Sequence, residues 1–402
     1  MRPFSRTLPL ADARRLIDEA LAPVGRTESL RLEAAAWRVV ASDVVAPHDV
    51  PPFDRAAMDG YAVRAADTVG ATAISPVVLR LAGVAYTGDA PGTAVPPGGC
   101  VEIATGAPLP PGADAVVMVE ETARHDTGAV RVLVPAHASQ HIGKRGTDIA
   151  AGQTVVGRGQ QLNPARLGAV AALGSDTVEV FARPRVVIAA TGNEIVEPGR
   201  PLLPGQIHDV NTVSLASVVD AHGGEAVRLP AIADSLEALR QAFDATRDAD
   251  LVVLSGGSSV GDRDLLVDVV RERGEVIFHG IAVKPGKPTL FGRVGSRLVL
   301  GMPGNPTSCL SNAYILLVPI VRRLARLPPW RPETRRLPLS RRISSTPDRH
   351  QFYPVKLGDC AAIPVFKGSG DITSLSEADG YIEVPVGVGQ VDEGTEVEVT
   401  LF

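Results

Sequence analysis

Apolar and polar positions follow two different periods along the chain. Near its start, Leu10, Ala13, Ile17 and Leu21 recur every three or four positions, which predicts an amphipathic helix. We expect a second helix over residues 29–38. Between residues 50 and 142 the apolar runs become short and are separated by Pro and Gly, which is typical of a small β domain. A helix predicted over 164–173 then returns the chain to its first domain.

From residue 183 onward, continuous apolar runs alternate with helical patterns. RVVIAATGNE, EAVRLPAIA, ADLVVLSGG and GEVIFHGIAV are predicted strands, and VNTVSLASVVDAHG, SLEALRQAFDATRD and DLLVDVVRERG are predicted helices. Strands joined in this way are parallel and covered on both faces. Ligands of such sheets bind beyond the carboxyl ends of the strands. After the PPWRP linker at 328–332 the pattern is again strand-like, and we expect a small β-barrel.

These patterns predict a multidomain α/β protein with a mostly parallel central sheet. We expect a discontinuous N-terminal domain (1–46 and 142–180), an inserted β-rich domain (47–141), a central α/β domain (181–328) and a C-terminal β-barrel domain (329–402). A chain of 402 residues is long enough for two to four domains.

Composition excludes several classes of protein. The formal net charge is −5, whereas a nucleic-acid binder usually carries an excess of basic residues. Cys100, Cys309 and Cys360 are too widely spaced for a disulfide framework or a cysteine-based zinc site, so we expect a reducing, cytoplasmic environment. The N-terminus carries charges where a signal peptide is apolar, and the longest apolar run, 313–321, is about half of what a bilayer requires. We therefore expect no membrane association.

Four loops of the alternating region follow predicted strands and should meet at one rim. They are ATGNE, SGGSSVGDRD, VKPGKP and GMPGNPTS. Gly256, Gly257 and Gly261 would let backbone N–H groups approach an oxyanion, and a helix start adds favourable partial charge. Each loop alone could be a structural turn, but the four together favour a phosphate-like binding site.

Asp262 and Asp264 at the exit of the glycine-rich loop would repel a bare anion. At about 4 Å and an effective dielectric of about 20, a carboxylate opposes a phosphate charge by roughly 4 kcal/mol. A divalent cation reverses the sign, and Mg²⁺ prefers one or two carboxylates together with phosphate oxygens and water. We interpret both residues as metal-side groups, with capping of the following helix as the alternative.

Lys284 and Lys287 each precede a proline, which indicates a rigid turn presenting two ammonium groups. Such charges suit phosphate or a tetrahedral oxyanion, although a solvated surface turn remains open. Glu194 follows an apolar strand. It could coordinate a metal or act as a base, or it could simply stabilise the start of a helix. The irregular segments 51–67 and 104–121 carry Asp54, Asp59 and Thr105 among prolines and glycines, a composition that indicates either function or structural turns.

Seven motifs of the chain resemble the molybdopterin molybdenumtransferase family, the MoeA and gephyrin E-domain molybdenum insertases. In chain order they are VPPFDRAAMDGYAV, ATGAPLPPGADAVVMVE, ATGNEI, SGGSSVGDRD, VKPGKP, GMPGNPTS and KGSGDITSLSEADGYI. The resemblance covers nearly the whole chain. It implies that the central domain binds molybdopterin and that the protein is a homodimer whose MDGYAV segment faces the partner's α/β domain. It also implies Mg²⁺-dependent hydrolysis of adenylylated molybdopterin, with release of AMP and insertion of molybdate.

The resemblance also implies roles for individual residues. Asp59, Thr105, Asp148, Glu194 and Asp264 would act in catalysis, and Asp262, Asp264 and Glu194 would hold the metal. The substrate-binding residues would be Ser255, Gly256, Gly257, Ser259, Lys284, Lys287, Pro303, Gly304, Asn305, Pro306, Ser308, Arg349 and Ser369, the last two toward molybdate.

The chain departs from the family pattern at a few positions. Asn193 and Thr147 stand where many members carry an acidic residue, so one carboxylate is absent from each of these loops. Gly280 replaces a lysine that some members carry, and His350 replaces a glutamate that usually follows the arginine. The KGSGDITSL run also differs from the commoner form. These departures concern the metal geometry and the cation count rather than the fold.

Other activities remain open at this stage. A related α/β fold adenylylates molybdopterin, but the extra 180 residues before the central domain and 70 after it favour insertion. A non-catalytic scaffold would not need to retain both carboxylates and both lysines. A nucleotide pyrophosphatase of the competence-damage type would not need the MDGYAV segment. We further expect contact with the adenylyltransferase and with acceptor molybdoenzymes. The sequence does not separate molybdate from tungstate.

Overall fold

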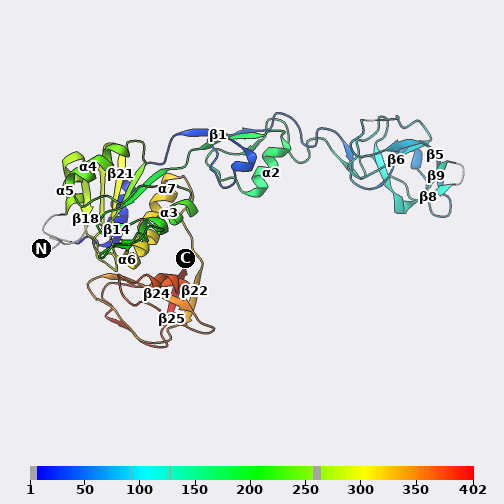
Figure 1. Ribbon diagram of the computed structural model, residues 1–402. Coiled ribbons are helices and arrows are strands. Elements are labelled where there is room, and N and C mark those ends of the chain that lie inside the picture. Colours follow the sequence, from blue (N-terminus) through cyan, green and yellow to red (C-terminus); the bar gives the residue numbers. More distant parts are fainter. Residues whose placement is uncertain (1–6, 91, 126–127, 257–263) are drawn as a thin grey trace. The chain divides into compact units, whose positions relative to one another are not determined.

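The computed structural model describes residues 7–90, 92–125, 128–256 and 264–402 (Figure 1). Two compact units emerge from it. One comprises the N-terminal residues to 28, residues 37–39 and the chain from 179 to 402, and the other comprises residues 29–36 and 40–178. Within the described residues, no helix is both long and apolar enough to cross a membrane.

The first unit is built around a six-stranded sheet. Its order is β16 (Glu225–Arg228), β13 (Arg185–Ala190), β17 (Leu251–Ser255), β21 (Arg297–Met302), β20 (Leu290–Val294) and β18 (Glu275–His279). The ladders among β16, β13, β17 and β21 are parallel, whereas β20 is antiparallel to both of its neighbours. Strand β18 therefore runs in the same direction as the four parallel strands. The predicted mostly parallel sheet is confirmed, and the loops after its strands meet at one rim.

Helices cover both faces of this sheet, as the continuous apolar strands require (Figure 1). On one face lie α1 (Leu10–Ala20), α3 (Asn211–Ala221), α6 (Pro306–Asn312), a π-helical turn (Ala313–Leu317) and α7 (Val318–Leu324); on the other lie α4 (Leu236–Ala245) and α5 (Leu265–Arg273). Successive residues of a strand pack into the hydrophobic cores on opposite faces of the sheet. Val186 and Ile188 point to the first face, and Val187 and Ala189 to the second.

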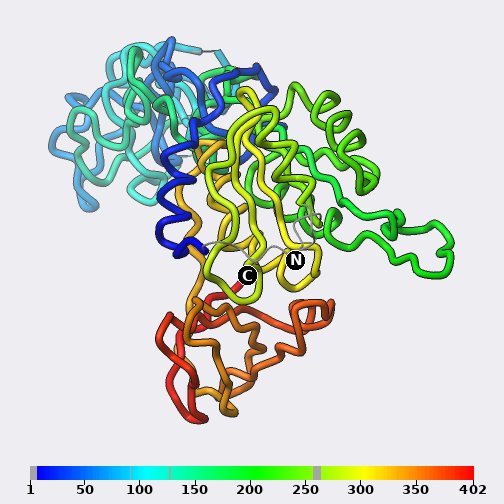
Figure 2. Tube along the Cα trace, turned by 90° about the vertical axis from the view of Figure 1, so that its left-hand side faces the viewer, coloured from blue at the N-terminus to red at the C-terminus, as the bar shows by residue number. Residues whose placement is uncertain are grey.

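The predicted C-terminal β domain is confirmed. Its main sheet runs β19 (Val283–Lys284), β24 (His350–Leu357), β26 (Gly380–Val384), β28 (Glu396–Leu401) and β22 (Thr334–Pro338), and β25 (Ala362–Pro364) also pairs with β24. Strands β23 (Ile343–Ser344) and β27 (Gln390–Val391) form a separate pair, and α8 (Thr373–Ser376) is a single turn. Because β19 pairs in parallel with β24, this domain is attached directly beside the rim of the larger sheet (Figure 2).

The second unit carries its own β core. Its sheet order is β7 (Ala115–Met118), β4 (Gly60–Val63), β6 (Gly99–Ile103), β5 (Val77–Ala85), β9 (Ala129–Val132) and β8 (Thr122–His125). Short pairs form between β3 (Arg55–Ala56) and β10 (Ile142–Gly143) and between β2 (Val44–Val45) and β11 (Thr154–Val156). Helix α2 (Pro164–Ala172) is capped by Asn163, whose side chain accepts a hydrogen bond from the backbone N–H of Arg166. The domain boundaries given above stay predictions.

The helix expected over 29–38 is wrong. This stretch forms β1 (Thr27–Arg31), which pairs with β12 (Thr177–Phe181), and a 3₁₀ turn (Leu32–Ala34). Trp37 then adopts a φ of 64°, which no right-handed helix allows. A strand partner nearly 150 positions away in the chain has therefore overridden the local helix preference of an alanine-rich segment.

Candidate functional site

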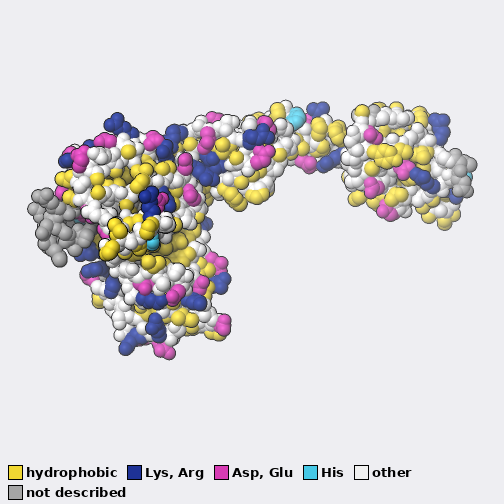
Figure 3. Space-filling model, in the orientation of Figure 1, with side chains coloured by type: hydrophobic (Ala, Val, Ile, Leu, Met, Phe, Trp, Pro, Cys, Tyr) yellow, Lys and Arg dark blue, Asp and Glu magenta, His cyan; other side chains and the backbone are white. Residues whose placement is uncertain are grey.

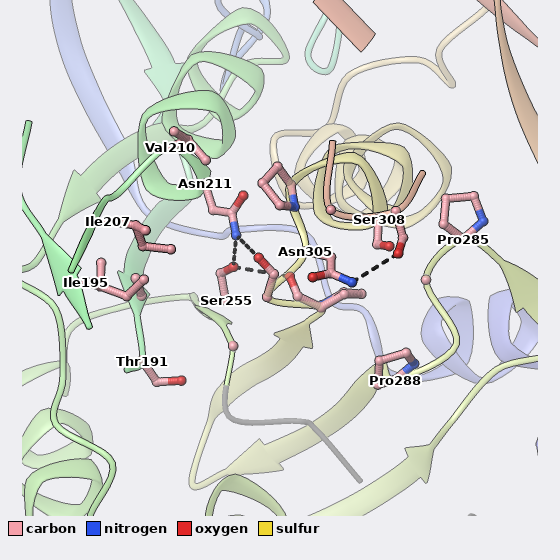
Figure 4. A pocket seen from close by; sticks show the side chains of 18 of the residues that line it. Thr191, Ile195, Ile207, Val210, Asn211, Ser255, Pro285, Pro288, Asn305 and Ser308 are labelled. Carbon is pink, nitrogen blue, oxygen red and sulfur yellow. Dashed lines mark hydrogen bonds between the residues drawn. The ribbon is translucent and has the colours of Figure 1, made fainter. Parts of the chain in front are cut away.

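A cavity of about 1390 Å³ lies beyond the carboxyl ends of the sheet strands in the first unit. All four loops singled out in the sequence contribute to it. From the described residues its polar lining includes Glu194, Ser255, Lys284, Lys287, Asn305, Ser308, Arg349 and Ser369, together with Gly256, Pro303, Gly304 and Pro306. The prediction that these loops converge on one rim is confirmed (Figure 4).

The cavity is electrically polarised along the order of the strands. Glu194 and Asp234 follow β13 and β16 at one edge of the sheet, whereas Lys284 and Lys287 follow β18 at the other edge. Partial desolvation, together with the nearby negative charge of Glu194, raises the pKa of Asp234. Elsewhere on this unit, acidic and basic side chains are interspersed on the face shown in Figure 3. Within the cavity, by contrast, the acidic and basic side chains follow strands at opposite ends of the sheet order.

Backbone crowding explains the glycine after strand β17. Gly256 has a φ of +97°, and a Cβ there would lie 2.6 Å from the carbonyl oxygen of Thr191. A larger residue would have to push the β13 loop away. A Cβ on Gly304 would in turn meet the Cα of Gly256 at 3.4 Å. Three neighbouring loops thus touch through their backbones, and the N–H groups of Thr191 and Gly256 bond to carbonyl oxygens of Ser255 and Met302, at 2.8 and 3.0 Å.

Asn211, the first residue of α3, joins two of these loops. Its Nδ2 donates to Oγ of Ser255 and to the carbonyl oxygen of Gly304, both at 2.7 Å (Figure 4). The hydroxyl of Ser255 donates to the carbonyl of Pro303 at 3.3 Å. These bonds fix the β17 exit against the β21 exit in the floor of the cavity.

The C-terminal domain forms one wall of the cavity. Nζ of Lys284 donates to Oγ1 of Thr346 at 2.7 Å, and Nδ2 of Asn305 donates to Oγ of Ser369 at 3.1 Å. Arg349, which lines the same wall, is 3.5 Å from the carboxylate of Asp348. Two predicted anion-binding residues from outside the α/β domain, Arg349 and Ser369, thus line the same cavity as Lys284 and Lys287.

Asp264 adopts the capping position that was the alternative interpretation. Its Oδ1 accepts the backbone N–H of Val267 at 3.2 Å, which makes it the N-cap of α5. Its Oδ2 is buried and lies 3.1 Å from Nε2 of His279. Capping uses only one carboxylate oxygen, so it does not exclude a second role. The predicted partners Gly257, Ser259 and Asp262 lie outside the described residues.

The remaining predicted residues belong to the second unit. Oδ1 of Asp59 accepts hydrogen bonds from the backbone N–H of Thr105 at 2.7 Å and from its hydroxyl at 2.9 Å. These bonds lower the pKa of Asp59, the backbone bond being the larger cause. Asp148 pairs with Arg55 at 3.3 Å. The structure therefore brings Asp59 and Thr105 together, although 46 positions separate them in the chain.

Comparisons with known proteins cover the chain almost from end to end. Residues 8–174 match the MoeA N-terminal region (domain I and II), residues 187–323 a probable molybdopterin binding domain, and residues 336–402 the MoeA C-terminal region (domain IV). Molybdopterin molybdenumtransferase 2 of Mycobacterium tuberculosis is 37% identical over 93% of this chain and 95% of its own length. The chain belongs to the MoeA family.

Other MoeA family members support the same assignment. Molybdopterin molybdenumtransferase of Bacillus subtilis is 30% identical over 96% of this chain and 94% of its own length. A crystal structure of the MoeA protein of Pyrococcus horikoshii covers 98% of this chain and 99% of its own, with 40% identity and a TM-score of 0.86. The multidomain fold expected from the sequence is therefore confirmed.

The sequence of this MoeA family chain did not single out several polar residues of the cavity, among them Asp234 and Asn211. Asp234 follows the EAVRLPAIA run, so the rule that ligands bind beyond strand ends already pointed to it. Asn211 opens a helix, where an asparagine is readily interpreted as a structural cap. Its contact with Ser255 and Gly304 depends on tertiary packing and has no local signal.

Proposed function

We propose that this cavity is where the molybdopterin molybdenumtransferase binds adenylylated molybdopterin and molybdate and transfers molybdenum to the pterin dithiolene, with hydrolysis and release of AMP. The observation that carries the proposal is the polarised lining of the cavity. Lys284, Lys287 and Arg349 at one end suit oxyanions, and Glu194 and Asp234 at the other suit a bound cation.

The residues of the cationic end would bind and orient the anionic groups. Lys284 and Lys287 supply point charges to molybdate or to the pterin phosphate, and Arg349 can bind an oxyanion through two parallel N–H donors. Ser308 near the start of α6 and Ser369 on the opposite wall add hydroxyl donors. Because these groups come from two domains, an oxyanion can be enclosed from both sides and shielded from water.

Magnesium fits the acidic end of the cavity. Among the described residues no three potential ligands cluster, but Mg²⁺ needs only one or two carboxylates when phosphate oxygens and water complete its shell. Desolvation and, second to it, the charge of Glu194 raise the pKa of Asp234, and a shared cation would stabilise the ionised form of both carboxylates. These two residues would hold it. Asp264 follows the glycine-rich loop but is not among the described residues that line the cavity, and its Oδ2 lies beside His279. When bound, the Mg²⁺ would polarise phosphoryl oxygens.

The Asp59–Thr105 pair in the second unit would act on a site completed by another copy of the chain. The hydrogen bonds from Thr105 keep Asp59 ionised, so it can accept a proton or orient a water molecule rather than donate one. The homodimer and the part played by Asp148 rest on the family resemblance and form part of the proposal. Asp59→Asn should lower AMP release without changing the affinity for molybdate.

The test follows AMP release by the purified protein from adenylylated molybdopterin, with and without molybdate. Release that depends on both molybdate and Mg²⁺ supports the proposal. Consumption of ATP with formation of pyrophosphate would instead assign the upstream adenylylation. Absence of both activities, in protein that binds molybdopterin, would indicate a scaffold.

A further inference from the structure

A buried amide, Asn312, ends helix α6 beneath the turn that carries Lys284 and Lys287. Its side chain is fully buried, and its Nδ2 donates to the carbonyl oxygen of Gly286 at 2.9 Å and to Oγ1 of Thr289 at 2.7 Å. The Thr289 hydroxyl, also fully buried, donates to the same Gly286 carbonyl at 2.8 Å. The three groups form a closed triangle of hydrogen bonds around the centre of the turn.

The contact between the amide and the turn leaves no room for a side chain at Gly286. Gly286 has a φ of +110°, and a Cβ there would lie 2.1 Å from Oδ1 of Asn312. On its far side the turn is held by the carbonyl of Lys287, which accepts the backbone N–H groups of Ile281 and Thr289, each at 3.0 Å. Asn312 and these backbone bonds therefore fix the turn from both sides.

We propose that Asn312 is a positioning residue for oxyanion binding, because it holds the turn in the conformation that presents Lys284 and Lys287 to the cavity. The proposal deepens the proposed function, on which it rests. Asn312 is not among the residues that line the cavity, so it acts through the turn. Lysine side chains lose much rotamer freedom when they bind an anion. A backbone that is already held in the binding conformation lowers the remaining entropy cost of binding.

Asn312→Leu, which keeps the size of the side chain but removes its donor, tests this in the full-length protein. Isothermal titration with inorganic molybdate should give a Kd about tenfold higher than that of the wild type, which corresponds to about 1.4 kcal/mol. Thr289→Val interrupts the same triangle and should raise the Kd in the same direction. The double variant should be less affected than the two single effects combined, because both act through the carbonyl of Gly286.

Thr246→Val is the matched control. This buried threonine of the same unit donates to the carbonyl of Phe243 at 3.3 Å and accepts from Arg297 at 3.2 Å, and it does not line the cavity. It should lower the Tm while leaving the Kd within about twofold. If Asn312→Leu changes the Kd no more than Thr246→Val does, the positioning role is overturned.

Amide hydrogen exchange provides a readout that needs no ligand. In Asn312→Leu the amides of Ile281 and Thr289 should exchange at least about tenfold faster, whereas those of strand β17 should not change. Unchanged exchange, or faster exchange with an unchanged Kd, would overturn the inference while leaving the proposed function intact. A wild-type protein that binds no molybdate would instead refute the proposed function, and the exchange data would still decide whether Asn312 holds the turn. If Asn312→Leu does not fold, Thr289→Val alone is judged by the same two measurements.

Discussion

Replacing Asp264 by asparagine and by alanine separates its structural role from its proposed chemical role. Asp264 caps α5 through one oxygen, 3.2 Å from the backbone N–H of Val267, while the other oxygen lies beside His279. Asparagine caps helices about as well as aspartate, whereas alanine leaves the first turn without an acceptor. The two variants therefore share the loss of the carboxylate but differ in the helix cap.

The magnitudes follow from this geometry. Loss of the cap in Asp264→Ala should lower the free energy of unfolding by about 1 kcal/mol, and the Tm of a unit of this size by about 2–4 °C. Asp264→Asn should keep the Tm within about 1 °C of the wild type, because its side-chain oxygen can still accept from Val267. If the carboxylate takes part in the reaction, both variants should release AMP at least about 100-fold more slowly.

Thermal unfolding by circular dichroism and AMP release followed by chromatography are the two assays. If Asp264→Asn lowers the Tm as much as Asp264→Ala does, the cap geometry is not what stabilises α5. AMP release by Asp264→Asn within threefold of the wild type would remove the carboxylate from the mechanism and leave Asp264 as a cap alone.

Three further predictions concern stability and pH. Because partial desolvation and, second to it, the charge of Glu194 raise the pKa of Asp234, its ionised form is less favourable in the folded protein. Asp234→Asn should therefore raise the Tm at pH 7 slightly, with a gain of less than about 1 kcal/mol in the free energy of unfolding. This gain should vanish below pH 3.8, the ordinary pKa of the carboxyl group. A lower Tm of the variant at pH 7 would show that the ionised Asp234 does not destabilise the fold. The His350 hydrogen bond lowers the pKa of Glu383, so Glu383 stabilises the fold above its ordinary pKa of 4.5 and this stabilisation is lost as the pH falls. Glu383→Gln should lower the Tm at pH 7 but not near pH 3, and equal losses at both pH values would refute this. Phe291→Ala, which empties a fully buried position stacked on Phe278, should cost about 3–5 kcal/mol in urea denaturation, and a cost below about 1 kcal/mol would show that the site collapses.

Strong local periodicity made much of the first unit predictable. Helices α1 and α4 have one apolar face, and strands such as Leu251–Ser255 are apolar throughout because both faces of the sheet are covered. Where the apolar pattern was weak, local preference failed. Residues 29–38 favour a helix in isolation, yet strand pairing with Thr177–Phe181 fixed part of them as β1.

The candidate site was predictable only as a set of loops. The sequence placed Glu194, Ser255, Lys284 and Asn305 after strands, and the shared direction of those strands was enough to bring them to one rim. It did not predict which oxygen of Asp264 would be used for the helix cap. The outcome depended on where α5 begins, and helix boundaries are the least certain part of a sequence-based prediction.

The sequence by itself determined the alternation of strands and helices in the central α/β domain, the family and the residue types available for chemistry, because periodicity and motifs are encoded locally. Only the tertiary structure decided which side chains hold one another: Asn211 between two loops, Lys284 against Thr346 of the C-terminal domain, and Asn312 beneath Gly286. These pairs are separated by 26 to 93 positions in the chain. A hydrogen bond of about 3 Å between such distant residues depends on how packed elements meet, and no local pattern carries that information.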